Sequence, residues 1–285
     1  MGFILKCALN PMTREFGFSQ ADYERAAAHL YRIAGISLGD SRMEMVYSRL
    51  SRELRRLRLQ SVTAYLDYLD NAGQHEWTRF VNILTTNLTS FFREHHHFDI
   101  LTQKVLPAAQ RPARIWSCGC ASGEEPYSIA ITCHEYFQDD PASVRILATD
   151  INTTMLQDAA AGVFERERVD SVSPERVRRY FLNGSGAYAA QVKIKDTLRR
   201  SIDFRMLNLM QPVWDIEGRF DAIFCRNVMI YFDKSTQYQI LKRFVPLLKQ
   251  PHGLLFAGHS EAFFNAKDLF KPLGATTYRV ADGAR

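Results

Sequence analysis

The chain has 285 residues, a formal net charge of +5 and 46% hydrophobic residues, values that suit one large globular domain or two smaller ones. Its apolar runs fall short of the ~20 residues needed to cross a bilayer, which excludes a membrane-spanning helix. The weak basic charge indicates an acidic partner without distinguishing nucleic acid, membrane and protein.

The cysteines indicate a reducing compartment. All five are scattered, odd in number and free of any CxxC pair, so a disulfide framework is not expected. The N-terminal run FILKCAL is interrupted by Lys6 and makes a poor signal peptide. Lys6 also stands where a myristoylation signal requires Ser or Thr. We therefore expect a cytoplasmic protein with reduced thiols.

Helical patterns extend from about residue 19 to residue 90. Ser19 is suited to cap a helix that begins QADYERAAAHLYRIAG, and Gly35 is suited to end it. In the next predicted helix, Ser41 to Leu59, apolar residues recur at spacings of three and four and form one face. These patterns predict a small helical bundle.

Arginines dominate the opposite face of the predicted helix over residues 41–59. Six arginines and two glutamates give this segment a charge of +4, nearly the whole excess of the chain. A solvated face would explain them, but the charge is concentrated and of one sign, so we favour partner binding. The arginines expected to contact the partner are Arg42, Arg49, Arg52 and Arg56.

After Phe91, strand-forming apolar runs alternate with helical segments, which predicts a parallel sheet covered by helices on both faces. The strand candidates are RIWSC, VRILATD, IDFRMLNL, FDAIFCRNVMIYF, GLLFAGHS and TTYRV, and the helix candidates are EEPYSIAITCHEYF, NTTMLQDAAAGVF and KSTQYQILKRFVPLL. Gly184 and Gly186 interrupt the alternation, and VKIK alternates like an exposed strand. These residues predict a small antiparallel insertion.

The stretch from Arg114 to Ile131, RIWSCGCASGEEPYSIAI, allows three interpretations. A metal site lacks further ligands at suitable spacing, and a redox pair would favour CxxC. A turn fits better, because Gly119 and Gly123 permit a ligand close to the backbone at the edge where α/β sheets bind ligands. The GxGxxG fingerprint is absent, and Glu124 and Glu125 would repel a phosphate. The two acids suit a cationic nucleoside such as S-adenosylmethionine.

Two further strand ends carry polar residues. Asp150 ends VRILATD, where it is suited either to accept hydrogen bonds from ribose hydroxyls or to cap the next helix. Arg226 and Asn227 end a central apolar strand, and Tyr231 could reach the same edge of the sheet. Arg226 is suited either to a structural ion pair or to a bidentate grip on a substrate carboxylate.

Two other motifs are rejected as catalytic sites. Three consecutive histidines, His95 to His97, point about 100° apart on a helix, so they cannot converge on one metal ion and are expected on the surface. GHSEA, Gly258 to Ala262, imitates a nucleophile elbow, but no histidine follows Ser260 to complete a hydrolase triad. We predict no metal site and no serine nucleophile.

Together, NLTSFFRE, WSCGCASGEEPYSIAI, LATDIN, FDAIFCRNVMIYFDKSTQ and LLFAGHSEAF resemble the CheR family, the chemotaxis receptor glutamate methyltransferases, over nearly the whole chain. The resemblance implies an α/β fold: a Rossmann-like S-adenosylmethionine-dependent methyltransferase domain over residues 91–285, with a small antiparallel β-subdomain inserted at about 173–200. It also implies an N-terminal all-helical, receptor-contacting domain over residues 12–90. The cofactor would be S-adenosylmethionine and the product S-adenosylhomocysteine.

The resemblance also implies site residues. Cofactor contacts fall on Asn87, Thr89, Arg93, Glu124, Asp150, Asn208, Leu209, Arg226 and Asn227. Arg226, Tyr231 and Arg93 are implied nearest the methyl acceptor, a glutamate of the cytoplasmic helical domain of a chemotaxis receptor. Family members that tether to a receptor peptide carry a three-glycine loop. Here Ala190 stands in place of the third glycine. The resemblance therefore does not imply that this chain tethers to a receptor peptide.

The implied reaction forms a glutamate methyl ester, and a glutamate with a pKa of ~4.3 needs no general base at neutral pH. We expect a monomer that binds no nucleic acid and does not insert directly into a membrane. A nucleic-acid methyltransferase is the first alternative, but its usual N-methylating signature is absent and no aromatic residues interleave the arginines. A non-catalytic receptor adaptor that senses the cofactor is the second, and Arg226 and Tyr231 count against it.

Overall fold

The computed structural model describes residues 14–284, which form two compact units. Within the described residues, the helical unit comprises residues 14–29 and 38–84, and the sheet unit comprises residues 30–37 and 85–284. Lys6 and Cys7, on which part of the expected localisation rests, lie outside the described residues. Within residues 14–284, no helix has both the length and the apolar character that crossing a membrane requires.

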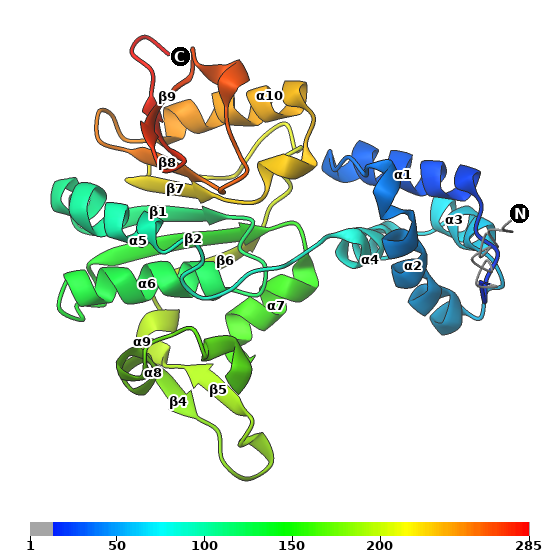
Figure 1. The fold of residues 1–285 in the computed structure, drawn as a ribbon, viewed down its shortest axis with the longest axis horizontal. Helices are drawn as coiled ribbons and strands as arrows, with labels where there is room; N and C mark the ends of the chain where they lie inside the picture. The colour runs from blue at the N-terminus through cyan, green and yellow to red at the C-terminus, as the bar shows by residue number, and fades with distance from the viewer. Residues whose placement is uncertain (1–13, 285) are drawn as a thin grey trace, which may run out of the picture. The chain divides into compact units, whose positions relative to one another are not determined.

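The helical unit confirms the expected all-helical region (Figure 1). Its helices are α1 (Gln20–Ala34, the last turn of which belongs to the sheet unit), α2 (Met43–Leu57), α3 (Val62–Asp70) and α4 (Gln74–Leu84). Ser19 caps α1: its hydroxyl accepts a hydrogen bond from the Asp22 N–H, and its own N–H donates to the Asp22 carboxylate. α1 ends at Gly35, which adopts a left-handed φ of 69°.

Helix α2 is shorter than the predicted segment 41–59. A 3-10 turn, η1 (Asp40–Arg42), precedes it, and Arg58 ends it in a left-handed conformation with φ of 57°. The predicted apolar face is buried, with Val46, Leu50 and Leu54 each 0% exposed. The position of α2 in the helical unit is therefore fixed by burial of its apolar face and not by its arginine-rich face.

The sheet unit contains a seven-stranded sheet with the order β6-β2-β1-β7-β8-β10-β9. Its strands are β1 (Ala113–Cys118), β2 (Val144–Asp150), β6 (Ile202–Met206), β7 (Ala222–Cys225), β8 (Leu254–Ala257), β9 (Phe270–Gly274) and β10 (Thr277–Val280). The strands from β6 to β8 in this order pair in parallel, whereas β10 is antiparallel to both of its neighbours. Strand β9 was not predicted, because Pro272 and Gly274 weaken its strand pattern, and these residues are tolerated at a sheet edge.

Both faces of the sheet are covered, as the alternation of strands and helices predicted. Ile115 of β1 belongs to one apolar core together with residues of α6 (Glu124–Tyr136), whereas Trp116 belongs to a second core with residues of α10 (Lys234–Phe244). Further helices of this unit are α5 (His96–Ile100), α7 (Thr153–Ala161), α8 (Pro174–Tyr180) and α9 (Asp196–Arg199). Neighbouring strand residues thus face opposite cores, the pattern of a doubly covered sheet.

A three-stranded antiparallel sheet with the order β3-β5-β4 matches the expected insertion, and two of its strands, β4 and β5, are labelled in Figure 1. Its strands are β3 (Val163–Glu165), β4 (Phe181–Asn183) and β5 (Gln191–Ile194). It begins before the expected residue 173, and the prediction that residues 162–164 continue a helix was wrong. Gly162 ends α7 in a left-handed conformation, and β3 is too short to show an alternating pattern.

Candidate functional site

The residues singled out in the sequence follow four neighbouring strands. β6, β2, β1 and β7 are consecutive and parallel in the sheet, so their carboxyl ends meet at one edge. Asn208 and Leu209 follow β6, Asp150 ends β2, Glu124 lies beyond the turn after β1, and Arg226 and Asn227 follow β7. The structure therefore brings to one edge the groups that the sequence analysis identified separately.

The turn after β1 needs its glycines for packing as well as for conformation. Gly119 has a φ of 83°, and a Cβ there would collide with the side chain of Val228. Gly123 has a φ of 101°, and a Cβ would lie 3.0 Å from the Cβ of Ala159 in α7. Thr149 holds the turn to β2, because its carbonyl accepts the N–H of Gly119 at 2.7 Å. The turn is thus fixed by its neighbours on both sides.

The two cysteines of this turn are buried packing groups. Cys118 and Cys120 are each 1% exposed and are free thiols. Burial, with the nearby Asp150 adding to it, raises the pKa of the Cys120 thiol well above its ordinary value. A thiol in this state is a poor nucleophile and a poor metal ligand.

Asp150 anchors the turn from the next strand. One carboxylate oxygen accepts the N–H of Ala121 at 2.8 Å, and the other accepts the N–H of Asn152 at 2.8 Å. The helix-capping alternative is wrong, because the side chain of Asn152 caps α7 instead. Burial raises the pKa of Asp150, although its N–H partners oppose the shift. Its carboxylate retains lone pairs for further donors.

Glu124 is buried and already pairs with a cation. Its side chain is 0% exposed, and its carboxylate accepts hydrogen bonds from the Ser122 hydroxyl, at 2.7 Å, and from the Arg168 guanidinium. Arg168 lies in the short helix η4 (Arg166–Val169) and also donates to the carbonyl of Thr89 at 3.4 Å. No pattern in the sequence pointed to Arg168, because it lies 44 residues from Glu124 in a charged run.

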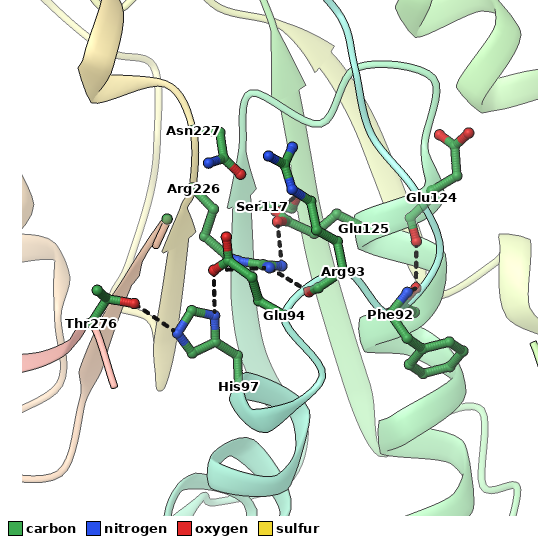
Figure 2. A network of polar contacts seen from close by, with 12 residues as sticks. Phe92, Arg93, Glu94, His97, Ser117, Glu124, Glu125, Arg226, Asn227 and Thr276 are labelled. Carbon is green, nitrogen blue, oxygen red and sulfur yellow. Dashed lines mark hydrogen bonds and ion pairs between the residues drawn. The ribbon is translucent and has the colours of Figure 1, made fainter. Parts of the chain in front are cut away.

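Arg226 forms the buried ion pairs that the sequence analysis offered as one of two alternatives. Its side chain is 2% exposed, with Nη1 3.0 Å from Glu125 and Nη2 3.3 Å from Glu94. Nη2 also donates to the carbonyl of Arg93, and the Ser117 hydroxyl donates to Glu125 at 2.7 Å (Figure 2). The guanidinium therefore links β7, α6 and the segment before α5 instead of projecting into solvent.

The two carboxylates of this network differ in their pKa. Burial raises the pKa of Glu125, against the opposing charge of Arg226. Burial also acts to raise the pKa of Glu94, but the His259 N–H and the Arg226 charge outweigh it, so that this pKa is lowered. The network therefore keeps a negative charge on Glu94 beside a fixed guanidinium.

The histidine triplet is only partly at the surface, so that expectation was wrong for His97. His97 is 0% exposed, and its Nε2 donates to the carbonyl of Ala275 at 2.9 Å. Burial, with Arg226 as the second cause, lowers the pKa of His97 to about 4. Ligand atoms of His96, His97 and Glu94 lie within 4.8 Å of one another, but the Arg226 guanidinium next to Glu94 disfavours a metal cation there.

The segment before α5 contributes backbone as well as side chains. Thr89 offers its carbonyl to Arg168, and Arg93 offers its carbonyl to Arg226. The Arg93 guanidinium donates to the carbonyl of Leu88 at 3.0 Å and extends away from the ion-pair network (Figure 2). Asn87 is partly exposed. Thr89 and Arg93 thus touch the network around Glu124 and Arg226 through main-chain atoms.

Asn208 and Tyr231 adjoin residues 30–37 within the sheet unit. The Asn208 amide donates to the carbonyl of Ile33 at 2.7 Å, and its oxygen accepts the N–H of Met210 at 2.9 Å. The carbonyl of Tyr231 accepts the N–H of Ser37 at 2.8 Å, and the Tyr231 side chain is partly exposed. Leu209 is largely buried. Both polar atoms of the Asn208 side chain are thus already paired.

In the helical unit, the four arginines predicted to contact a partner fall into two kinds. Arg42 and Arg52 are exposed. Arg49 donates to the carbonyl of Ile83 at 3.0 Å. Arg56 forms ion pairs with Glu53 at 2.5 Å and Glu76 at 2.7 Å. Arg56, although exposed as well, is therefore held by ion pairs within this unit, whereas Arg42 and Arg52 project into solvent.

Comparison with known proteins identifies relatives over nearly the whole chain. Residues 87–279 match the model of the CheR methyltransferase SAM-binding domain, and residues 21–85 match the CheR methyltransferase all-alpha domain. Chemotaxis protein methyltransferase 2 of Pseudomonas aeruginosa is 47% identical over 94% of this chain and 96% of its own length. Chemotaxis protein methyltransferases of Salmonella typhimurium and Escherichia coli are 45% and 44% identical, each over 95% of this chain and over 93% and 94% of their own lengths.

Proposed function

The chain belongs to the CheR methyltransferase family, and from this premise we propose that it esterifies glutamate side chains of chemotaxis receptors. It is an S-adenosylmethionine-dependent methyltransferase of chemotactic adaptation, and its product from the cofactor is S-adenosylhomocysteine. The proposal adds the acceptor: a glutamate carboxylate in the cytoplasmic helical domain of a receptor, which becomes a methyl ester. It also places the enzyme in the cytoplasm.

The chemistry of the sheet edge fits this cofactor. Glu124 is a buried carboxylate whose surroundings accommodate a cation, the Arg168 guanidinium, and an ammonium group has the same charge and donor character. Asp150 binds two backbone N–H groups and keeps lone pairs for ribose hydroxyls. The observation that most supports the proposal is the ion pair between the buried carboxylate of Glu124 and the guanidinium of Arg168.

The reaction requires orientation rather than proton removal. When bound, S-adenosylmethionine supplies a methyl group attached to a positively charged sulfur. A receptor glutamate with a pKa of ~4.3 is already ionised at neutral pH. A carboxylate oxygen forms a bond to the methyl carbon as the carbon–sulfur bond breaks, and the two charges are neutralised. The contribution of this chain is alignment, worth up to about 7–11 kcal/mol in favourable cases.

We propose Arg93 and Tyr231 as the catalytic residues that contact the acceptor. Both are partly exposed, and Tyr231 lies on η6 (Met229–Tyr231), directly after the turn that follows β7. Arg226 has a different proposed role, because its guanidinium is occupied by Glu94 and Glu125. It acts as a positioning residue that fixes the carbonyl of Arg93 and thereby the direction of the Arg93 side chain.

Arg42 and Arg52 are proposed to guide the receptor. They are exposed residues of an arginine-rich segment, and receptor helices that carry glutamates present an opposite charge. Charge complementarity between two proteins raises their association rate and orients them more than it raises their affinity. Salt weakens this effect by screening the charges.

The proposed function is tested by incubating the enzyme with a purified receptor cytoplasmic domain and S-adenosylmethionine labelled in its methyl group. We expect the label to enter the receptor and to leave as methanol in mild base, because an ester hydrolyses where an N-methyl group does not. Replacing the receptor glutamates by glutamine should abolish incorporation. Base-stable label would instead indicate a different acceptor group.

A further inference from the structure

The GHSEA motif, rejected above as a nucleophile elbow, has a buried carboxylate at its fourth position, Glu261. It follows β8, next to the turn that follows β7. Ser260 is exposed, whereas Glu261 is 3% exposed. The motif therefore presents its acid, and not its serine, to the protein interior.

Glu261 binds the backbone of two strand ends. Its Oε2 accepts the N–H of Asn227 at 2.8 Å and that of Gly258 at 2.5 Å, and its Oε1 accepts the N–H of Ile230 at 3.2 Å. A buried carboxylate is costly without donors, and these N–H groups supply them. One side chain thus ties the turn after β8 to residues 227–230 after β7.

The turn that Glu261 holds has a backbone conformation that needs support. Asn227 has a left-handed φ of 59°, which costs a non-glycine residue free energy unless its surroundings enforce it. Gly258 packs against it so closely that a Cβ would lie 2.5 Å from the Asn227 amide nitrogen and 2.8 Å from its backbone nitrogen. Glu261, through a hydrogen bond, and Gly258, through close packing, therefore both constrain the backbone of Asn227.

We infer that Glu261 is a positioning residue for methyl transfer: its carboxylate fixes the turn from Arg226 to Tyr231. This inference rests on the proposed function, in which that turn carries Asn227 toward the cofactor and Tyr231 toward the acceptor. A carboxylate is required because both of its oxygens accept N–H groups. The side-chain amide of a glutamine would instead present its NH₂ group, which is a donor, to one of these backbone N–H groups.

The test compares Glu261→Gln with Ser260→Ala, an exposed neighbour in the same motif. We expect Glu261→Gln to speed amide hydrogen exchange in residues 226–231 and to lower turnover about tenfold, the effect of losing one charge-assisted hydrogen bond. It should also weaken binding of S-adenosylhomocysteine in calorimetry, while β1 amides exchange as in the parent. Ser260→Ala should change none of these quantities. Unchanged exchange and unchanged binding in a folded Glu261→Gln protein would overturn the inference.

A second variant keeps the inference testable if Glu261→Gln does not fold. Gly258→Ala leaves the carboxylate in place and displaces Asn227 by contact, so it should give the same faster exchange and weaker binding. Parent-like exchange and binding in Gly258→Ala would contradict the inference. Hydrogen exchange and calorimetry require no receptor. Their results therefore test this inference even if the methyl group transferred to the receptor proves not to form an ester.

Discussion

The Arg168 guanidinium donates a hydrogen bond to the buried carboxylate of Glu124, 44 residues earlier in the chain. Arg168 belongs to η4, next to the small antiparallel sheet, so the inserted segment reaches the residue proposed to bind the cofactor's ammonium group. The same guanidinium contacts the carbonyl of Thr89 and the hydroxyl of Ser122. One carboxylate thus faces two possible cations, one from the chain and one from the ligand.

Arg168→Ala should strengthen the binding of S-adenosylhomocysteine, because the ammonium group no longer competes with a guanidinium for Glu124. We expect a change of about 1 kcal/mol, roughly fivefold in the dissociation constant, measured by titration calorimetry. Arg166→Ala, a change in the same short helix at an exposed arginine, serves as the control. Weaker binding by Arg168→Ala would mean that Arg168 helps to hold the ligand.

Arg226→Ala should destabilise the fold as well as depress turnover. It leaves Glu94 and Glu125 without their shared cation in a buried site, a change that typically costs about 3–5 kcal/mol. Arg205→Ala is the matched control, because Arg205 pairs with Asp203 where both side chains are more than half exposed, and such pairs contribute about 0–1 kcal/mol. Equal free energies of unfolding for the two variants in denaturant titrations would contradict the structural role of Arg226.

The contribution of His97 to folding stability should fall as the pH drops below about 6.5. Burial, followed by the charge of Arg226, lowers the pKa of His97 from 6.5 to about 4, so the unfolded state binds a proton that the folded state does not between these values. The stability from neutral His97 is therefore complete above pH ~6.5 and is lost toward pH ~4, in total about 3 kcal/mol. Denaturant titrations from pH 7 to pH 4.5 measure this slope.

His97→Gln removes the titrating group and should flatten that pH dependence. Glu94 and Arg226 also face this site, and they remain charged partners in both proteins. His75→Gln, at a residue whose side chain is 90% exposed, is the control and should keep the parental slope. If His97→Gln loses stability with pH as steeply as the parent protein, His97 is not the group responsible.

Arg42→Glu combined with Arg52→Glu should slow receptor methylation about tenfold at low ionic strength, within the range that electrostatic steering covers. The deficit should shrink as salt rises, because screening removes the steering. Both residues are exposed, so the free energy of unfolding should change by less than about 0.5 kcal/mol. Arg166→Glu combined with Arg205→Glu, a double reversal at two exposed arginines of the sheet unit, tests the effect of the same change in net charge. Parental rates for the double variant at low salt would rule out this role.

Apart from β9, the sheet could be predicted from the sequence because each strand is indicated by a pattern within its own residues. Apolar runs such as FDAIFC and helices such as KSTQYQILKRF carry their own periodicity, and the motif after β1 has glycines where the structure requires them. Residues at the ends of parallel strands meet at one edge by topology alone. The grouping of Glu124, Asp150 and Arg226 therefore followed from placing each residue at, or shortly after, the carboxyl end of a strand.

The partners of these residues were not predictable, because they come from distant segments. Glu94 and Glu125 pair with Arg226 across more than 100 residues of sequence, and Arg168 reaches Glu124 from the inserted segment. Glu261 was hidden in a motif that resembled a different kind of site. No local pattern distinguishes a buried, paired side chain from an exposed one of the same type.

The central claim is that Glu124 faces the amino group of the cofactor while Asp150 faces its ribose. Titration calorimetry with two ligands tests it directly: S-adenosylhomocysteine, and methylthioadenosine, which keeps the nucleoside but lacks the amino acid. Glu124→Gln should weaken the first ligand by about 1.5–3 kcal/mol, the range for a hydrogen bond to a charged group, and leave the second unchanged. Asp150→Asn should weaken both. Equal losses for the two ligands in Glu124→Gln, or no binding of either ligand by the parent protein, would contradict the account.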